Sequence, residues 1–285
     1  MFRKKAQDAL SFALVLLTSM FVSNTAISAD NSIYVRQSGN NTTVTITQDG
    51  AGNVVRGIQG SGSDNTTPAS IVGNVNTVTI NQVGTGNVLD FGVTTSVANG
   101  GTFGGVYNYS VEGNNASAKI DSNDNGEGTS SSNLVSVVQT GNTAATNVNV
   151  LGSSNSITAT TSGGSGNSFT ATVNGNNNTQ AVSISGGGNN TVTVNQGKGG
   201  TALGKVEGVT ELATTNYNGS VSITVVGTSN TASVVQTGIQ NTTVLNITGG
   251  SNLAAVTQAA TAGNTTVNLT SNGSNNTFTI TSTNH

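Results

Sequence analysis

A four-residue motif, Gly-x-x-Asn, returns at a nearly constant interval along the chain. Within uninterrupted stretches, neighbouring copies lie 11 or 12 residues apart, or twice that. The copies end at Asn53, Asn65, Asn76, Asn87, Asn155, Asn167, Asn178, Asn190, Asn230, Asn241, Asn252 and Asn276. A short fixed interval is the signature of a solenoid, in which each unit stacks on the next. The repeat therefore argues against the flexible low-complexity chain that abundant Gly, Asn, Ser and Thr would otherwise suggest.

Segments of alternating side chains lie between the motifs. Examples are NTVTINQ at 76–82 and NTVTVNQ at 190–196, whose period of two indicates half-buried strands. Gly and Asn suit the intervening turns because they adopt positive φ at low cost. Two strand–turn units form one coil of about 22 to 24 residues. The sequence thus predicts an all-β fold, a parallel β-solenoid with two facing sheets, about ten coils and a length of roughly 50 Å.

The alternation also determines which polar side chains point inward. In the segment 76–82, Asn76 and Gln82 share a face with two apolar residues, so burial of the apolar side chains buries both amides. The spacing Asn-x5-Gln recurs at Asn31 and Gln37, Asn76 and Gln82, Asn133 and Gln139, Asn190 and Gln196, Asn230 and Gln236, and Asn252 and Gln258, and Thr42 takes the Asn place before Gln48. A buried amide without a partner costs about 1–3 kcal/mol. Identical amides on successive coils avoid this cost by bonding to one another in a ladder.

We therefore predict a ladder of internal amides that also mediates self-assembly. Its residues are Gln37, Gln48, Asn53, Gln59, Asn76, Gln82, Asn87, Asn133, Gln139, Asn190, Gln196, Asn230, Gln236, Asn241, Asn252 and Gln258. The Gln residues favour a ladder because they keep a fixed offset from an inward Asn. The Gly-x-x-Asn asparagines alone fit a turn-forming role equally well.

Residues 1–29 have the layout of a cleavable secretory signal peptide. Basic residues from Arg3 to Lys5 precede an apolar run from Leu10 to Val22 and then small residues up to Ala29, which is the order found in such signals. The apolar run is short for a membrane span. We expect a mature repeat domain at 30–285 without a membrane-spanning segment.

The remaining composition excludes several functional classes. Five basic and ten acidic residues give the mature chain a formal charge of −5, which argues against a nucleic-acid partner. Cys is absent and the single His is the terminal His285. A His-based triad, a zinc site or a thiol nucleophile therefore cannot be assembled within the fold. We expect neither an enzyme nor a cofactor.

The regular spacing fails near 91–110, 121–132 and 198–218, where we expect insertions that loop out of the stack. They are either contact surfaces or tolerated loops. In the second of them, Asp121, Asn123 and Asn125 imitate the start of a calcium-binding loop, but its twelfth position is Ser132 instead of Glu. A solvated turn also explains this segment.

One stretch of the repeat matches a known family pattern. Thr42, Gln48, Gly50, Asn53, Val55 and Gln59 stand in order at the six positions of Ser-x5-Gln-x-Gly-x-x-Asn-x-Ala-x3-Gln, and partial matches follow at Gln82, Gly84, Asn87 and Leu89 and at Gln236, Gly238 and Asn241. This pattern resembles the curlin repeat, the unit of curli amyloid fibre subunits. The resemblance covers about Asn31 to Ile280. The closing Gln is mostly missing, for example at Val93 and Ile247, and the array is longer than the usual curli subunit.

The resemblance implies a structural subunit of an extracellular curli-like functional amyloid, a fimbria-like fibre that self-assembles end to end. It implies a role in biofilm matrix and surface adhesion outside a Gram-negative bacterium. It also implies two partners besides further copies of the chain, an outer-membrane secretion channel and a nucleator subunit.

A non-polymerising secreted β-solenoid is the alternative, either an adhesin or an ice-binding protein. Ice binding would use outward pairs of hydroxyl side chains at Thr43 and Thr45, Thr77 and Thr79, Thr158 and Thr160, Thr170 and Thr172, Ser183 and Ser185, Thr191 and Thr193, and Thr277 and Thr279. Because the pairs fall on successive half-coils, we expect them on both faces of the stack. Thr is also a good polar strand former without any such role.

Overall fold

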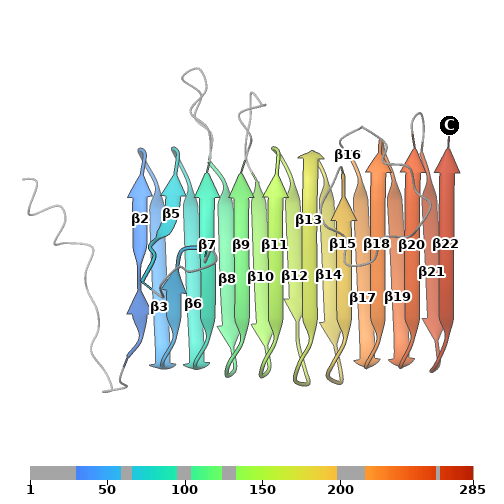
Figure 1. The fold of residues 1–285 in the computed structure, drawn as a ribbon, viewed down its shortest axis with the longest axis horizontal. Helices are drawn as coiled ribbons and strands as arrows, with labels where there is room; N and C mark the ends of the chain where they lie inside the picture. Colours follow the sequence, from blue (N-terminus) through green and yellow to red (C-terminus); the bar gives the residue numbers. More distant parts are fainter. Residues whose placement is uncertain are drawn as a thin grey trace, which may run out of the picture.

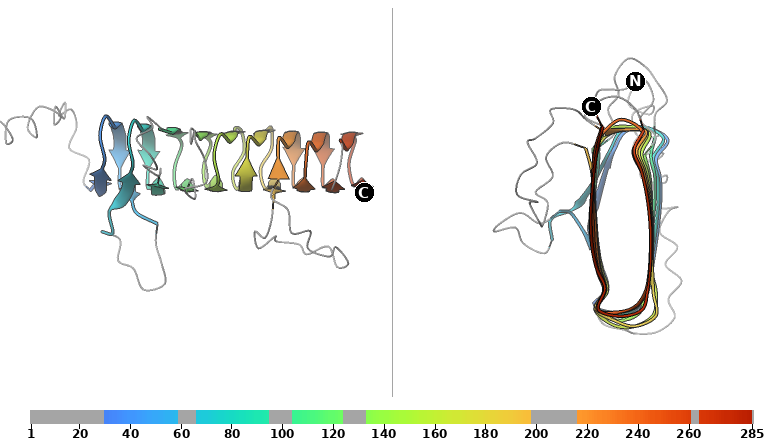
Figure 2. Two further views of the ribbon diagram at one scale, coloured as in Figure 1. Left: turned by 90° about the horizontal axis from the view of Figure 1, so that it is seen from above. Right: turned by 90° about the vertical axis from the view of Figure 1, so that its right-hand side faces the viewer.

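The computed structural model describes residues 30–58, 66–94, 104–123, 133–197, 216–260 and 264–284. These residues form strands and turns and contain no helix. The strands stack into two facing sheets that run the length of the molecule (Figure 1). Viewed along the long axis, the coils superpose into one narrow oval (Figure 2). The structure thus confirms the predicted parallel β-solenoid. No helix in the described part of the chain is long and apolar enough to cross a membrane.

The two sheets are named here by their order along the chain. The first sheet contains β1 (Ser32–Ile33), β2 (Val35–Ser38), β4 (Val54–Arg56), β5 (Ala69–Val72), β7 (Val88–Thr94), β9 (Ser117–Asn123), β11 (Ala145–Leu151), β13 (Ser168–Asn176), β15 (Thr191–Gln196), β16 (Asn216–Tyr217), β18 (Thr231–Gly238), β20 (Leu253–Ala260) and β22 (Thr277–Asn284). The second sheet contains β3 (Thr43–Ala51), β6 (Thr77–Thr85), β8 (Val106–Glu112), β10 (Leu134–Thr140), β12 (Ser156–Thr161), β14 (Thr179–Ser185), β17 (Ser220–Thr228), β19 (Thr242–Gly250) and β21 (Thr266–Asn272).

Successive strands of each sheet pair in parallel and in register. Thr43 of β3, for example, lies beside Thr77 of β6, which lies beside Val106 of β8. We call each level of one sheet a rung. The main path of the first sheet passes through ten rungs, and that of the second sheet passes through nine.

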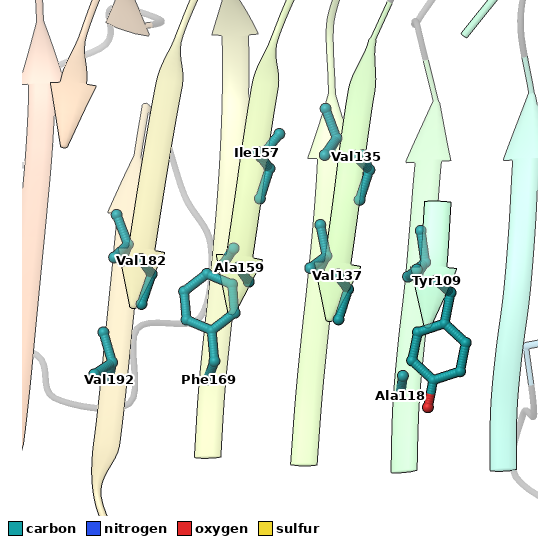
Figure 3. Packing of buried hydrophobic residues seen from close by; sticks show 14 of the residues in the cluster. Tyr109, Ala118, Val135, Val137, Ile157, Ala159, Phe169, Val182 and Val192 are labelled. Atoms are coloured by element: carbon teal, nitrogen blue, oxygen red, sulfur yellow. The ribbon is translucent and has the colours of Figure 1, made fainter. Parts of the chain in front are cut away.

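The core is a thin layer of side chains between the sheets. Apolar residues at alternate positions point inward, as Figure 3 shows for Val135, Val137 and Ile157. Most are Val, Ile, Leu or Ala, which fill the narrow gap between two sheets. The aromatic rings of Phe91 and Tyr107 meet edge to face at a centroid distance of 5.9 Å. The core is therefore continuous along the stack.

The Gly-x-x-Asn motif forms the turns. In Gly50–Asn53, Gly50 has φ +111° and Gly52 has φ +65°, the left-handed region that glycine adopts readily. The first Gly of the motif also lies against the next rung, because a Cβ on Gly50 would lie 1.9 Å from the carbonyl oxygen of Gly84. The glycine is needed for both reasons, positive φ and close stacking.

The predicted bounds of the insertions are wrong, because several of their first and last residues belong to strands. Phe91–Thr94 belongs to β7, Val106–Ser110 to β8, and Asp121–Asn123 to β9, and all three segments pair in register with their neighbours. The side chains of these segments follow the alternation of the strands. Their high content of aromatic and charged residues therefore did not indicate a loop. Residues 95–103, 124–132 and 198–215 lie outside the described residues. Asn216–Tyr217 forms β16, which pairs with β13.

Sequence analysis missed another break, between β4 and β5. The strand β4 ends at Arg56 and β5 begins at Ala69, yet both pair with β7 and occupy one rung. A Gly-x-x-Asn motif that ends at Asn65, outside the described residues, made this segment look regular in the sequence.

Candidate functional site

Asparagines immediately before the strands of the first sheet stack into a column, which we call the first asparagine column. Its members are Asn31, Asn53, Asn87, Asn167, Asn190, Asn230, Asn252 and Asn276. Ala116 and Ala144 hold the same place before β9 and β11 and interrupt the column. Most members are fully buried, and Asn276 at one end is half-buried.

Most asparagines of this column bind the next rung through both atoms of the amide. Asn167 does so through Oδ1 alone, because its Nδ2 donates to the carbonyl oxygen of Gly164 in its own turn. The Oδ1 of Asn53 accepts a hydrogen bond from the backbone N–H of Asn87 at 3.1 Å. The Nδ2 of Asn53 donates to the carbonyl oxygen of Gly84 at 2.9 Å. The next step repeats the arrangement, from Asn87 to the N–H of Ala116 and the carbonyl oxygen of Gly113. One inward amide thus fixes the turn of the following rung.

In the C-terminal half of this column, the amides also bond to one another. Asn190 donates from Nδ2 to Oδ1 of Asn167 at 3.0 Å. The same contact joins Asn230 to Asn190, Asn252 to Asn230 and Asn276 to Asn252, at 3.0–3.1 Å. Every amide between the two ends has a partner on both sides, so burial leaves little unsatisfied polarity.

The second sheet carries a less continuous asparagine column. Asn133, Asn155 and Asn178 form its longest run, in which the backbone N–H of Asn155 donates to Oδ1 of Asn133 and that of Asn178 donates to Oδ1 of Asn155, both at 3.0 Å. Asn76 accepts from the N–H of Gly105 at 2.9 Å. Asn241 accepts from the hydroxyl of Thr265. Gly and Thr therefore substitute for Asn at several rungs.

The glutamines form two short ladders instead of one long ladder. In the second sheet, Gln48 donates from Nε2 to Oε1 of Gln82 at 2.7 Å. In the first sheet, Gln196 donates to Gln236 at 2.9 Å, and Gln236 donates to Gln258 at 2.8 Å. The register explains why both ladders are short. Val111 follows Gln82 in the second sheet, and Val93, Ser122, Val150 and Val173 fill the Gln position of the rungs before Gln196 in the first sheet.

Gln139 is buried without a Gln neighbour. Its Oε1 accepts from the hydroxyl of Tyr109 at 2.9 Å, and its Nε2 donates to Oγ1 of Thr146 at 3.0 Å. Burial raises the pKa of Tyr109 well above its usual value, so its hydroxyl stays protonated and able to donate. Side chains of other types thus satisfy an inward amide where no ladder forms.

Gln37, like Gln139, is a predicted ladder glutamine that does not enter a ladder. Gln37 is exposed and donates to the carbonyl oxygen of Gly39 at 2.7 Å. Gln59 lies outside the described residues, and the position beside Gln37 in the next rung is held by Ile71 of β5. The break between β4 and β5 brings Ile71 to this position.

Sequence analysis overlooked Asn155, Asn167, Asn178 and Asn276 as inward amides, although each ends a Gly-x-x-Asn motif. They have no Gln six residues later, where the residues are Thr161, Val173, Ile184 and Ser282, and they lie outside the partial curlin matches that contain Asn87 and Asn241. It also overlooked Gln180, which is 1% exposed and whose two side-chain polar atoms have no hydrogen-bond partner. Gln180 lies between Ile157 and Val221 in register, so no neighbouring amide is within its column.

The first residues of the calcium candidate lie in a strand. Asp121 and Asn123 belong to β9, beside Asn149 and Leu151 of β11, and Asn125 lies outside the described residues. Across the described ranges, no cluster of three His, Cys, Asp or Glu residues could hold a metal ion.

Both ends of the described stack have strand edges without a neighbour. The first and last rungs are β1–β2 and β22 in the first sheet, and β3 and β21 in the second. Four inward apolar side chains of these rungs are only half-buried, whereas their counterparts further in are fully buried; the four are Val35, Ile46, Leu269 and Ile280. The ends thus combine unpaired backbone groups with partly exposed core.

Comparisons with known proteins give no relative. No protein-family model matches the chain, and no curated protein or solved structure matches it.

Proposed function

We propose that this protein is a structural subunit that stacks end to end into an extracellular fibre. The observation that carries the proposal is that the first asparagine column extends to the last described rung, where the amide of Asn276 has no further rung to bond. Asn276 bonds inward to Asn252 through its backbone N–H and Nδ2, whereas Asn252 also accepts through Oδ1 from the N–H of the following rung and donates to a carbonyl oxygen there. A second copy would supply those groups.

The backbone supports the same proposal. An open strand edge presents a row of unpaired N–H and C=O groups and is a template for pairing with another chain. Two copies joined in this way would continue the 4.7–4.8 Å spacing of the rungs, which is the geometry of cross-β fibres. The half-buried apolar side chains at the ends would also become fully buried, which favours association.

The biological setting of the proposal comes from the resemblance to the curlin repeat. We propose secretion to the surface of a Gram-negative bacterium, a role in biofilm matrix and adhesion, and partnership with an outer-membrane secretion channel and a nucleator subunit. The proposal includes no catalytic activity and no cofactor.

The direct test is assembly of the purified mature chain after removal from denaturant. We expect thioflavin fluorescence to rise and oriented fibres to give a meridional reflection at about 4.7–4.8 Å. Persistent monomers at high concentration would contradict the proposal and favour the non-polymerising adhesin.

Ice binding has less support. The outward hydroxyl pairs lie on both sheets, for example at β6 and β12 of the second sheet and at β13 and β15 of the first sheet. A flat ice-binding face would concentrate them on one sheet. Shaping of ice crystals by the monomer would nevertheless restore this alternative.

A further inference from the structure

Head-to-tail docking of two copies faces a constraint of strand number. Among the described residues, the stack begins and ends with a strand of the first sheet, so that sheet has ten rungs and the second sheet has nine. The inference that follows rests on the proposed function, and concerns how the two ends meet.

Simple stacking would leave a gap. If β22 of one copy paired with β1–β2 of the next, the first sheet would continue without a break. In the second sheet, β3 of the next copy would then lie two rung spacings, about 9.6 Å, from β21. The place of one strand would be empty, and the half-buried side chains of Leu269 and Ile46 would gain no neighbour across it.

We propose that β22 of one copy displaces β1–β2 of the next copy and pairs directly with its β4 and β5. Both sheets are then continuous, because β21 of the first copy pairs with β3 of the second. This arrangement places Val267 beside Val44 and Leu269 beside Ile46, so apolar side chains meet apolar side chains. The second copy loses the contacts of its β1–β2 half-coil, and the gap in the second sheet is removed.

The sequence of β22 matches the half-coil that it replaces. The inward residues Asn31, Ile33 and Val35 of the first rung correspond in register to Asn276, Phe278 and Ile280 of the last. The amide is retained, and the two apolar side chains of β22 are larger. The replacement therefore covers the inward side chains of Val55 and Ala69 with more apolar surface.

The hydrogen bonds match as well. Asn31 accepts from the backbone N–H of Asn53 at 2.9 Å and donates from Nδ2 to the carbonyl oxygen of Gly50 at 3.0 Å. Asn53 and Asn252 bind the following rung through the same pair of groups. In the proposed junction, Asn276 of one copy takes over both partners of Asn31 in the next copy.

The first rung is the better candidate for displacement than the last. It consists of two short strands of 2 and 4 residues, whereas β22 is one strand of 8 residues. Ile33 is 49% exposed, and Gln37 bonds to its own turn instead of a neighbouring rung. Less structure is therefore lost when β1–β2 is displaced.

Paired cysteines distinguish the possible junctions, since the chain has no Cys of its own. In the proposed junction, Thr277 of one copy lies beside Val54 of the next, on the outer face. Equivalent residues of adjacent rungs are about 4.8 Å apart, within the range of about 4.4–6.8 Å that a disulfide spans. We expect fibres of the full mature chain with T277C and V54C to give a series of disulfide-linked multimers on a non-reducing gel. The single variants are matched controls and should remain monomeric on the gel.

Two other pairs report the competing junctions. Cross-linking of T277C with S32C in place of T277C with V54C would show that both end half-coils are kept, and would overturn the inference. Cross-linking of S32C with L253C would show that β22 is the strand displaced, and would also overturn it. Fibres that form but cross-link in either of these ways would leave the proposed function intact. Absence of fibres in the unmodified chain would instead contradict the proposed function.

Discussion

At the scale of single residues, burial of an amide is tolerated because the repeat brings a partner to it. Gln236 is fully buried, yet it accepts from Gln196 and donates to Gln258 and Thr243. Gln180 is equally buried but has apolar neighbours in register and no partner. Both glutamines lie on an alternating strand. They differ in the residues that lie beside them on the adjacent rungs.

This contrast predicts opposite effects of one substitution. Gln180→Leu removes an unsatisfied amide and should raise the free energy of unfolding by about 1–3 kcal/mol. Gln236→Leu leaves the buried Nε2 of Gln196 without its acceptor and should lower it by a similar amount. Urea unfolding of the monomeric chain measures both changes. Destabilisation by Gln180→Leu would show that this amide has a partner in solution.

At the scale of the turn and strand, the repeat motif combines a conformational and a packing requirement. The first Gly of the motif has positive φ in turn after turn, and its missing Cβ leaves room for the carbonyl oxygen of the next rung. Some third positions accept other residues in the left-handed region, including Asn41 and, less expectedly for a β-branched residue, Val75 with φ +58°. The motif is therefore stricter at its first position than at its third.

Adjacent glycines in one turn test this explanation. A Cβ on Gly249, at φ +120°, would lie 1.9 Å from the carbonyl oxygen of Gly273, whereas the nearest atom to a Cβ on Gly250 is 3.5 Å away. Gly249→Ala should destabilise the chain by at least about 1–2 kcal/mol, because it adds backbone strain to a steric clash. Gly250→Ala is the matched control and should be neutral or stabilising by less than about 1 kcal/mol. Equal melting temperatures for the two variants would be inconsistent with this account.

At the scale of the whole molecule, the period of the sequence was sufficient to predict the fold. The alternation of Val78 and Ile80 with Thr77 and Thr79 determines the inward face, and stacking in register follows from the repeat. The extent of each amide ladder could not be predicted, because it depends on which rungs become neighbours. Ile71 reaches the Gln position only because the chain departs from the stack between β4 and β5.

The most direct test of the central claim, that stacked internal amides join the subunits, is the rate of fibre growth of Asn276→Ala. This substitution removes the outward acceptor and donor of the first asparagine column, while the backbone N–H of residue 276 still bonds to Asn252. Asn268→Ala, at an exposed position of β21 in the last coil, is the matched control. The account predicts slower thioflavin growth for Asn276→Ala from an equally folded monomer, and an unchanged rate for Asn268→Ala. Growth of Asn276→Ala at the rate of the unmodified chain would contradict it.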